Sequence, residues 1–327
     1  MSDHPTIGLF VHGSDDADCF LWQANGPCGL HHPAASSAVQ FLPRDASADH
    51  VLVVTDPRPL AGLERRPWHE RKLGRLRGSE RWSRAEAHRA WDTIDREPSA
   101  VTLLVYEPPG MFSDTWFSVA RERCAIVAGP DPRCSHQIRL PATWWIDDPP
   151  NRLLAERRED VQSTRPIRLA CITSGRSELA GHRERLAFLA AVQEAGIDVA
   201  VFGRGLPASL KPRGSLRSKS FVLGQADYTI AIENYADGDR YVTEKLFDPL
   251  LCWSVPIYFG SEAATSMIPA KAFVRLPSLD CHAVERIRSV IHDHADRTDR
   301  LDAISAARAD VIKNHNLLTW ACGLVLG

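Results

Sequence analysis

The side chains best suited to chemistry lie in one stretch, residues 228–273. An apolar, β-prone run, Tyr228–Ile232, ends in a Glu-Asn pair, and after a loop rich in Asp and Gly the chain continues as Thr243-Glu244-Lys245. A helix N-terminus attracts anions, because it presents free N–H groups and partial positive charge, and a lysine in the first turn adds a further positive charge. The stretch therefore predicts a site for an anionic ligand of the nucleotide type.

Two strands and one helix must position these side chains. Thr243 is a good N-cap for a helix with apolar residues at Leu246 and Leu250, and the following run WSVPIYFG predicts a second strand that Gly260 ends. In such a unit the ligand lies at the carboxyl ends of the strands. Any strand–helix–strand unit needs a cap and a turn, so the spacing alone leaves a purely structural interpretation open.

The order of residues in this stretch is more specific than its spacing. The string ENxxxxxxYVTEKLFDPLLxWSVPIYFG, followed by PxxAF, resembles the donor-binding motif of the α1,3/α1,4-fucosyltransferases, inverting enzymes of bacterial and animal type that use GDP-fucose. The resemblance implies that Lys245 binds the donor diphosphate. It also implies that Asn234, Tyr241 and Glu244 contact the ribose or the sugar.

The same resemblance extends to an arginine upstream. In the family an arginine near the donor diphosphate is followed three and seven residues later by an aromatic and an aliphatic residue, and Arg185 has this spacing to Phe188 and Val192. Arg176 and Arg183 are close enough to be alternatives for this contact. The structural alternative is an arginine on a solvated helix face.

The candidate for catalysis is Glu107, in the N-terminal half. The run VTLLVYEPPG places this glutamate after an apolar strand and before a turn, where a carboxylate faces a cleft. The family has an acidic residue in this context that serves as general base, and the segment 138–145 also resembles the family. A solvated glutamate with no catalytic role is the alternative interpretation.

Length and pattern predict two α/β domains. The 327 residues are 44% apolar, enough for two cores. Strand-like runs are expected first in the N-terminal half and again from about Ile167, with a charged, Pro-rich linker between them; the N-terminal runs are 7–11, 19–22, 50–54, 101–106 and 124–128. The resemblance implies a GT-B-type fold, two facing Rossmann-like domains with the active site in the interdomain cleft. We therefore expect an acceptor-binding domain at 1–155 and a donor-binding domain at 156–327.

Charge and composition exclude some classes. A net charge of −2 argues against a nucleic-acid-binding protein. The segment 64–84 is strongly basic and holds two tryptophans. It is interpreted first as a salt-bridged surface, with peripheral contact to anionic lipid as the alternative. The chain shows no signal peptide and no run of about 20 apolar residues, which predicts a cytoplasmic enzyme.

No metal or cofactor is expected to be required. The eight cysteines are scattered without metal-ligand spacing, and reduced thiols are expected. Asp237-Gly238-Asp239 has the pattern with which other sugar transferases hold a divalent cation, but it occupies a turn-like loop and is interpreted as a turn.

Together these features predict an inverting transferase that moves fucose from GDP-fucose to a hydroxyl of a glycan or glycolipid, such as lipopolysaccharide, or of a glycosylated protein. Glu107 would be the general base, and Arg185 and Lys245 would hold the diphosphate. Two alternatives stay open: a transferase that uses a different nucleotide sugar, and an inactive nucleotide-sugar-binding protein.

Overall fold

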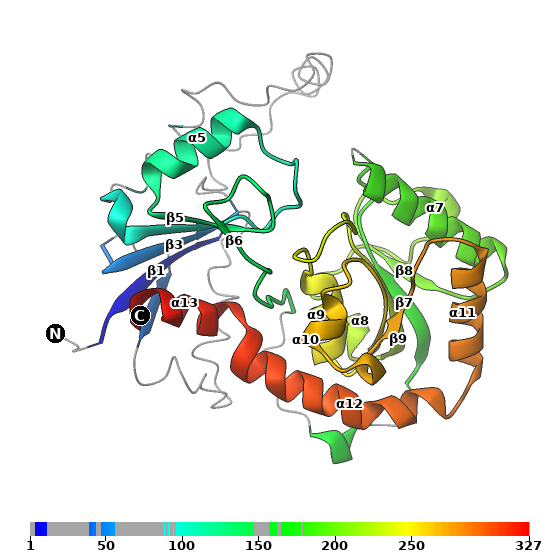
Figure 1. Ribbon diagram of the computed structural model, residues 1–327. Coiled ribbons are helices and arrows are strands. Elements are labelled where there is room, and N and C mark those ends of the chain that lie inside the picture. Colours follow the sequence, from blue (N-terminus) through cyan, green and yellow to red (C-terminus); the bar gives the residue numbers. More distant parts are fainter. Residues whose placement is uncertain are drawn as a thin grey trace. The chain divides into compact units, whose positions relative to one another are not determined.

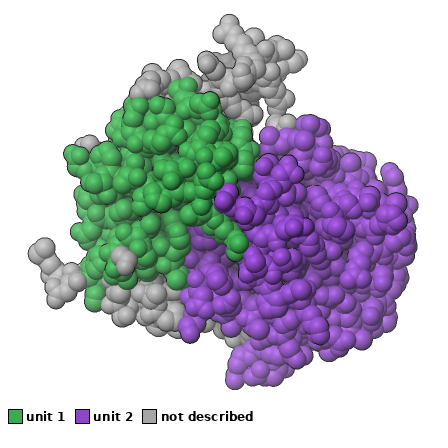
Figure 2. Space-filling view, viewed as in Figure 1, with its two compact units in different colours: residues 1–140, 318–327 green, residues 141–317 purple. Residues whose placement is uncertain are grey.

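The computed structural model describes residues 4–11, 39–43, 47–55, 88, 91, 94, 96–146, 157–161, 165–177 and 179–326. The chain divides into two compact units, shown in different colours in Figure 2. The first unit comprises residues 1–140 and 318–327, and the second comprises 141–317. The predicted boundary at 155/156 falls outside the described residues, as does the basic segment 64–84. The last ten residues join the first unit, a return that the sequence did not predict.

The first unit is built on a six-stranded parallel sheet in the order β2-β1-β3-β4-β5-β6. Its strands are β1 (Thr6–Val11), β2 (Gln40–Pro43), β3 (His50–Val54), β4 (Val101–Leu104), β5 (Ile126–Gly129) and β6 (His136–Gln137). The helical elements described with it are the 3-10 turn η2 (Pro98–Ala100), α5 (Asp114–Arg123) and α13 (Leu317–Leu326).

Helix α5 shows how local sequence and packing agree in this unit. Its N-cap, Ser113, accepts a hydrogen bond from the backbone N–H of Trp116 at 3.2 Å. Acidic Asp114 lies in its first turn and two arginines lie in its last turn, which suits the helix dipole. Trp116 and Phe117 are buried in one cluster with Leu103 of β4, so the helix covers the sheet with its apolar side.

The second unit contains a five-stranded parallel sheet in the order β11-β10-β9-β7-β8 (Figure 1). Its strands are β7 (Ile167–Ile172), β8 (Ala200–Phe202), β9 (Ala226–Ile232), β10 (Val255–Phe259) and β11 (Val274–Arg275). Its α-helices are α7 (Ala180–Glu194), α8 (Ser220–Leu223), α9 (Glu244–Leu251), α10 (Ala264–Met267), α11 (Cys281–His292) and α12 (Asp296–Asp310). Short 3-10 turns lie at η3 (Arg158–Asp160), η4 (Ala208–Leu210) and η5 (Ala270–Ala272), and a π-helical turn, η6 (Val311–His315), follows α12.

The centre of this second sheet is closed on both faces. All seven residues of β9 are buried, as expected for a parallel strand covered by helices on each side. In Figure 1, α7 and α11 lie on one side of the sheet, and α8 and α9 lie on the other.

The strand order also defines where a ligand should bind. From β7 the chain passes to β8 on one side, and then crosses to β9 on the other side of β7. The two connections leave the sheet in opposite directions, and such a switch point opens a crevice at the carboxyl ends of the strands. The carboxyl ends of β7 and β9 are therefore the expected binding edge of this unit.

The prediction of two parallel-sheet α/β units of GT-B type is confirmed, while the location of an active site between them stays a prediction. The runs expected at 7–11, 50–54, 101–106 and 124–128 correspond to β1, β3, β4 and β5. The run expected at 19–22 lies outside the described residues.

Candidate functional site

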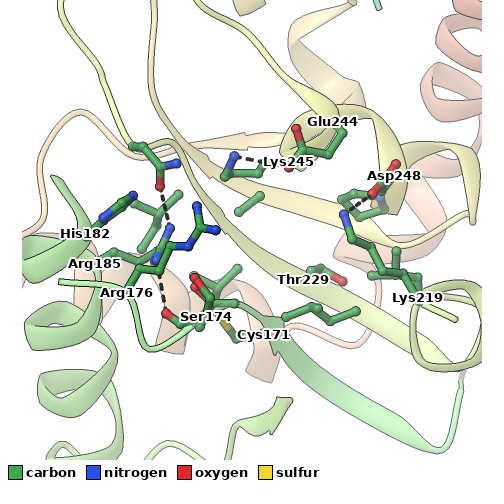
Figure 3. Close-up of a pocket in the computed structure, with 18 residues that line it drawn as sticks. Cys171, Ser174, Arg176, His182, Arg185, Lys219, Thr229, Glu244, Lys245 and Asp248 are labelled. Atoms are coloured by element: carbon green, nitrogen blue, oxygen red, sulfur yellow. Dashed lines mark hydrogen bonds and ion pairs between the residues drawn. The ribbon is translucent and has the colours of Figure 1, made fainter. Parts of the chain in front are cut away.

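A pocket of about 330 Å³ lies at the carboxyl ends of β7 and β9, the switch point of the second sheet (Figure 3). Its walls come from three segments: the end of β7 with the start of α7, the end of β9, and the region of α8 and α9. The polar side chains that line it are Thr173, Ser174, Arg176, His182, Arg185, Lys219, Thr229, Asn234, Glu244, Lys245 and Asp248.

Four of the five predicted donor-binding residues meet in this pocket. Arg185, Asn234, Glu244 and Lys245 all line it, although the first is 49 residues from the second along the chain. Tyr241 does not line it. That tyrosine is 3% exposed, and its ring packs edge-on against Tyr235 with the centroids 6.1 Å apart.

Arg185 is a buried residue of the pocket wall. Only 5% of it is exposed, so the interpretation as a solvated surface arginine is wrong. One guanidinium nitrogen donates to Asn234 Oδ1 at 2.5 Å and the other to the carbonyl oxygen of Ser174 at 3.2 Å. Its Nε has no hydrogen-bond partner within the described part of the chain. Burial lowers the pKa of this guanidinium from its usual value.

The two alternative arginines differ in their relation to the pocket. Arg176, between β7 and α7, lines it. Arg183 is exposed on α7, does not line the pocket, and donates to the carbonyl oxygen of Ser177 at 2.9 Å. Of the three, Arg176 and Arg185 are therefore placed to meet a ligand in the pocket.

A glycine allows α7 to approach the end of β9. A Cβ atom at Gly181 would lie 2.3 Å from the backbone carbonyl oxygen of Asn234, far inside van der Waals contact. The absence of a side chain at the second residue of α7 thus brings this helix, which carries Arg185, against the residue to which Arg185 donates.

The end of β9 holds a buried carboxylate that supports the start of α9. Glu233 is 1% exposed and accepts hydrogen bonds from Thr243, from the backbone N–H at 2.8 Å and from the hydroxyl at 2.8 Å. Tyr258 also donates to it at 3.4 Å. Thr243 is the N-cap that the sequence predicted, and it accepts from the backbone N–H of Lys245 at 3.4 Å. Sequence reasoning could not identify these partners, since a buried carboxylate gives no sign of which groups satisfy it.

Lys245 lies between two carboxylates. Its Nζ is 3.2 Å from Glu244 Oε1 and 3.4 Å from Glu233 Oε2. Burial disfavours the charged form of Lys245, but these two neighbours raise its pKa above the usual value. Burial likewise works against the charge of Glu244, yet Lys245 and Lys219 lower its pKa to about 2. Burial raises the pKa of Glu233.

A second ion pair, which the sequence reasoning missed, forms another part of the pocket. Lys219 Nζ lies 2.6 Å from Asp248 Oδ2, and the other oxygen of Asp248 accepts from the backbone N–H of Trp145 at 2.7 Å. Burial raises the pKa of Asp248 to about 6 in spite of the lysine. Asp248 follows Glu244 by one helical turn on α9, a spacing that could have marked it as a neighbour of the site. A single lysine before a short helix carries no such signal.

Glu107 lies in the first unit, after β4. It is half-buried and precedes a turn in which the backbone N–H of Gly110 donates to Asp131 Oδ2 at 3.1 Å. Gly110 has a positive φ of 82°, which favours glycine. The strand-then-turn context expected for Glu107 is present. Glu107 does not line the pocket of the second unit, and its catalytic role stays a prediction.

The Asp-Gly-Asp turn lies on the loop between β9 and α9. Asp237 and Asp239 are both exposed, and Gly238 has a positive φ of 80°, as a turn requires. Among the residues that the structure describes, no group of three or more His, Cys, Asp or Glu side chains is placed to hold a metal ion.

The comparison with known families points to one group. The sequence model described as glycosyltransferase family 10 (fucosyltransferase), C-terminal, matches residues 168–293, which include the whole pocket region from β7 to α9. This part of the second unit matches the fucosyltransferase family's C-terminal domain. The resemblance read from the sequence is therefore confirmed for this part of the chain.

Curated relatives of the fucosyltransferase domain share only a short segment. The human protein named GDP-fucose protein O-fucosyltransferase 3 is 35% identical over 100 residues, 30% of this chain and 20% of its own length. The chicken protein of the same name is 34% identical over 89 residues, 27% of this chain and 18% of its own length. This chain thus matches about a fifth of the length of these relatives.

Solved structures resemble the chain over nearly its whole length. An α1,3-fucosyltransferase with GDP matches with a TM-score of 0.52 at 14% identity, over 97% of this chain and 94% of the other. An α-glucosyltransferase in complex with UDP and DNA matches with a TM-score of 0.57 at 9% identity, over all of both chains. At these identities the likeness establishes the fold. Within the described residues, no helix is long and apolar enough to cross a membrane.

Proposed function

We propose that this protein is an inverting glycosyltransferase that moves fucose from GDP-fucose to a hydroxyl group of an acceptor. One observation carries the proposal: four residues predicted to bind the donor line one pocket. This pocket lies at the switch point of a sheet within the segment that the fucosyltransferase family model matches. A nucleotide diphosphate suits this pocket, because four cationic side chains line it.

The donor half of the reaction follows from the pocket's charges. As the glycosidic bond breaks, negative charge develops on the phosphate oxygen that leaves with GDP. Arg185 and Lys245 would stabilise that charge from two sides of the pocket, in the place of the divalent cation that other sugar transferases use. Asn234 holds Arg185 in position, and Glu233 and Glu244 hold Lys245.

The acceptor half is assigned to Glu107. Its carboxylate would take the proton of the acceptor hydroxyl while the hydroxyl oxygen attacks the anomeric carbon on the face opposite the leaving diphosphate. The sugar configuration is thereby inverted. Tyr241, buried beside the pocket residues, would act through the loop between β9 and α9 and not by contact with the donor.

The experiment that tests this proposal measures the product. Purified protein is incubated with GDP-fucose and a panel of acceptors that includes free glycans, lipid-linked glycans and peptides with Ser or Thr, and both GDP release and fucosylated product are followed. We expect a product whose anomeric configuration is opposite to that of the donor. A product with retained configuration would contradict the mechanism, and binding of GDP-fucose without transfer to any acceptor would favour an inactive binding protein.

A further inference from the structure

The four cations of the donor pocket are not equivalent. Lys219 and Lys245 each form an ion pair with a carboxylate, at 2.6 Å to Asp248 and at 3.2 Å to Glu244. Neither Arg176 nor Arg185 has an acidic partner within ion-pair distance among the described residues. The positive charge that is still available to a ligand is therefore concentrated on the two arginines.

Arg176 is the more accessible of the two. It lies in the segment between β7 and α7, it is exposed, and its side chain forms no hydrogen bond or ion pair with the described residues. Figure 3 shows it beside Arg185 on one side of the pocket, across from the pair formed by Lys219 and Asp248. It is close enough that its charge contributes to lowering the pKa of Arg185.

Two like charges in this arrangement repel each other. The repulsion is strongest where burial limits the screening by water, and Arg185 is 5% exposed. The Nε of Arg185 is also buried and has no partner in the described part of the chain, so this guanidinium is not fully satisfied by protein groups. Both features indicate a site shaped for an anion that is shared by the two arginines.

We propose that Arg176 is a second diphosphate-binding residue, which acts together with Arg185 on the donor. This inference rests on the proposed function, because it takes the ligand to be a guanosine diphosphate. Lys245 then does not serve mainly to attract the diphosphate by its charge. Held by Glu233 and Glu244, it contributes a fixed hydrogen-bond donor, while most of the net charge that attracts the diphosphate comes from the arginine pair.

The chain offers a matched control for this assignment. Arg183 is seven residues further along, is also exposed, and donates to the carbonyl of Ser177 outside the pocket lining. Arg176→Ala and Arg183→Ala remove the same charge from neighbouring positions. They should therefore change the overall charge of the protein equally, and of the two only Arg176→Ala removes a side chain from the pocket lining.

The test measures the dissociation constant of GDP by calorimetry at low and high NaCl for the intact protein and three variants. For Arg176→Ala we expect GDP binding roughly tenfold weaker and less dependent on salt, since one charge-assisted contact is lost. Arg176→Lys should recover part of the affinity, and Arg183→Ala should bind like the unaltered protein. The melting temperature of ligand-free Arg176→Ala should be unchanged or higher, because repulsion between the arginines is removed.

The outcomes separate the two proposals. If the unaltered protein binds GDP and both alanine variants bind it equally well, the role of Arg176 is refuted while the proposed function stands. If ligand-free Arg176→Ala melts at a lower temperature and its GDP affinity falls without a change in salt dependence, the residue is structural and the inference is again wrong. If the unaltered protein does not bind GDP at any salt concentration, the proposed function fails, and with it the ligand named here.

Discussion

Removal of the Lys219 ammonium group should leave the buried carboxylate of Asp248 without its ion-pair partner. Asp248 is 2% exposed, and without Lys219 the backbone N–H of Trp145, 2.7 Å away, is its one remaining side-chain hydrogen-bond partner among the described residues. Breaking a buried ion pair from one side costs about 3–5 kcal/mol; because 31% of the Lys219 side chain is exposed, solvent screening should reduce this to about 2–4 kcal/mol. We therefore expect Lys219→Met to lower the free energy of unfolding by this amount at pH 8.

The loss of unfolding free energy caused by Lys219→Met should depend on pH, and the pKa of Asp248 determines the direction. The pKa of Asp248 is raised in the folded protein to about 6, from 3.8. A folded state with a raised pKa binds its proton more tightly than the unfolded state, so the stabilising contribution of this group is present at low pH and is lost as pH rises through the folded pKa. Loss of Lys219 raises this pKa further. The decrease in the free energy of unfolding caused by Lys219→Met should accordingly be larger at pH 8 than at pH 5.

Urea unfolding followed by tryptophan fluorescence at both pH values tests this prediction. The control is Lys219→Met combined with Asp248→Asn, which removes both charges and leaves an amide oxygen to accept the bond from Trp145. The double variant should regain most of the lost free energy at pH 8. A stability of Lys219→Met within about 0.5 kcal/mol of the unaltered protein at pH 8, or a double variant as unstable as the single one, would refute this role of the ion pair.

Three further predictions concern the reaction and the site. Glu107→Gln should lower turnover by about 10²- to 10⁴-fold with an unchanged circular dichroism spectrum, whereas Glu97→Gln, an exposed glutamate before the same strand, should have no effect; equal turnover in both variants would remove Glu107 from the role of base. Lys245→Ala should raise the KM for GDP-fucose by roughly tenfold or more, since it also removes the lysine that pairs with Glu244 in the pocket lining and with the buried Glu233, and an unchanged KM would contradict this. Gly181→Ala should weaken GDP binding by pushing α7 away from β9, whereas Gly323→Ala, where a Cβ atom meets nothing, should not; identical titrations would show that this close approach is not needed.

The sequence predicted the parts of this site that follow from a local pattern. The apolar run before Glu233, the cap at Thr243 and the strand at Val255–Phe259 are each encoded by neighbouring residues, and the structure has them where they were expected. Because parallel strands share a carboxyl edge, the order of these elements was also sufficient to place Lys245 at that edge.

The parts that were missed depend on contacts between distant segments. Lys219 meets Asp248 from 29 residues away, and Trp145 meets it from 103 residues away, which no local pattern encodes. Tyr241 was expected in contact with the donor, but its ring is buried against Tyr235. The return of residues 318–327 to the first unit is likewise a matter of tertiary packing.

We propose that the pocket of the second unit binds the donor through cationic side chains without a metal ion. The most direct measurement is calorimetric titration of the protein with GDP-fucose, GDP-mannose and UDP-galactose, each with and without EDTA, alongside Lys245→Ala. We predict binding of the guanosine sugars that survives EDTA and is weakened in the variant. Preference for UDP-galactose, or loss of binding in EDTA, would contradict the account and would direct attention to Asp237 and Asp239.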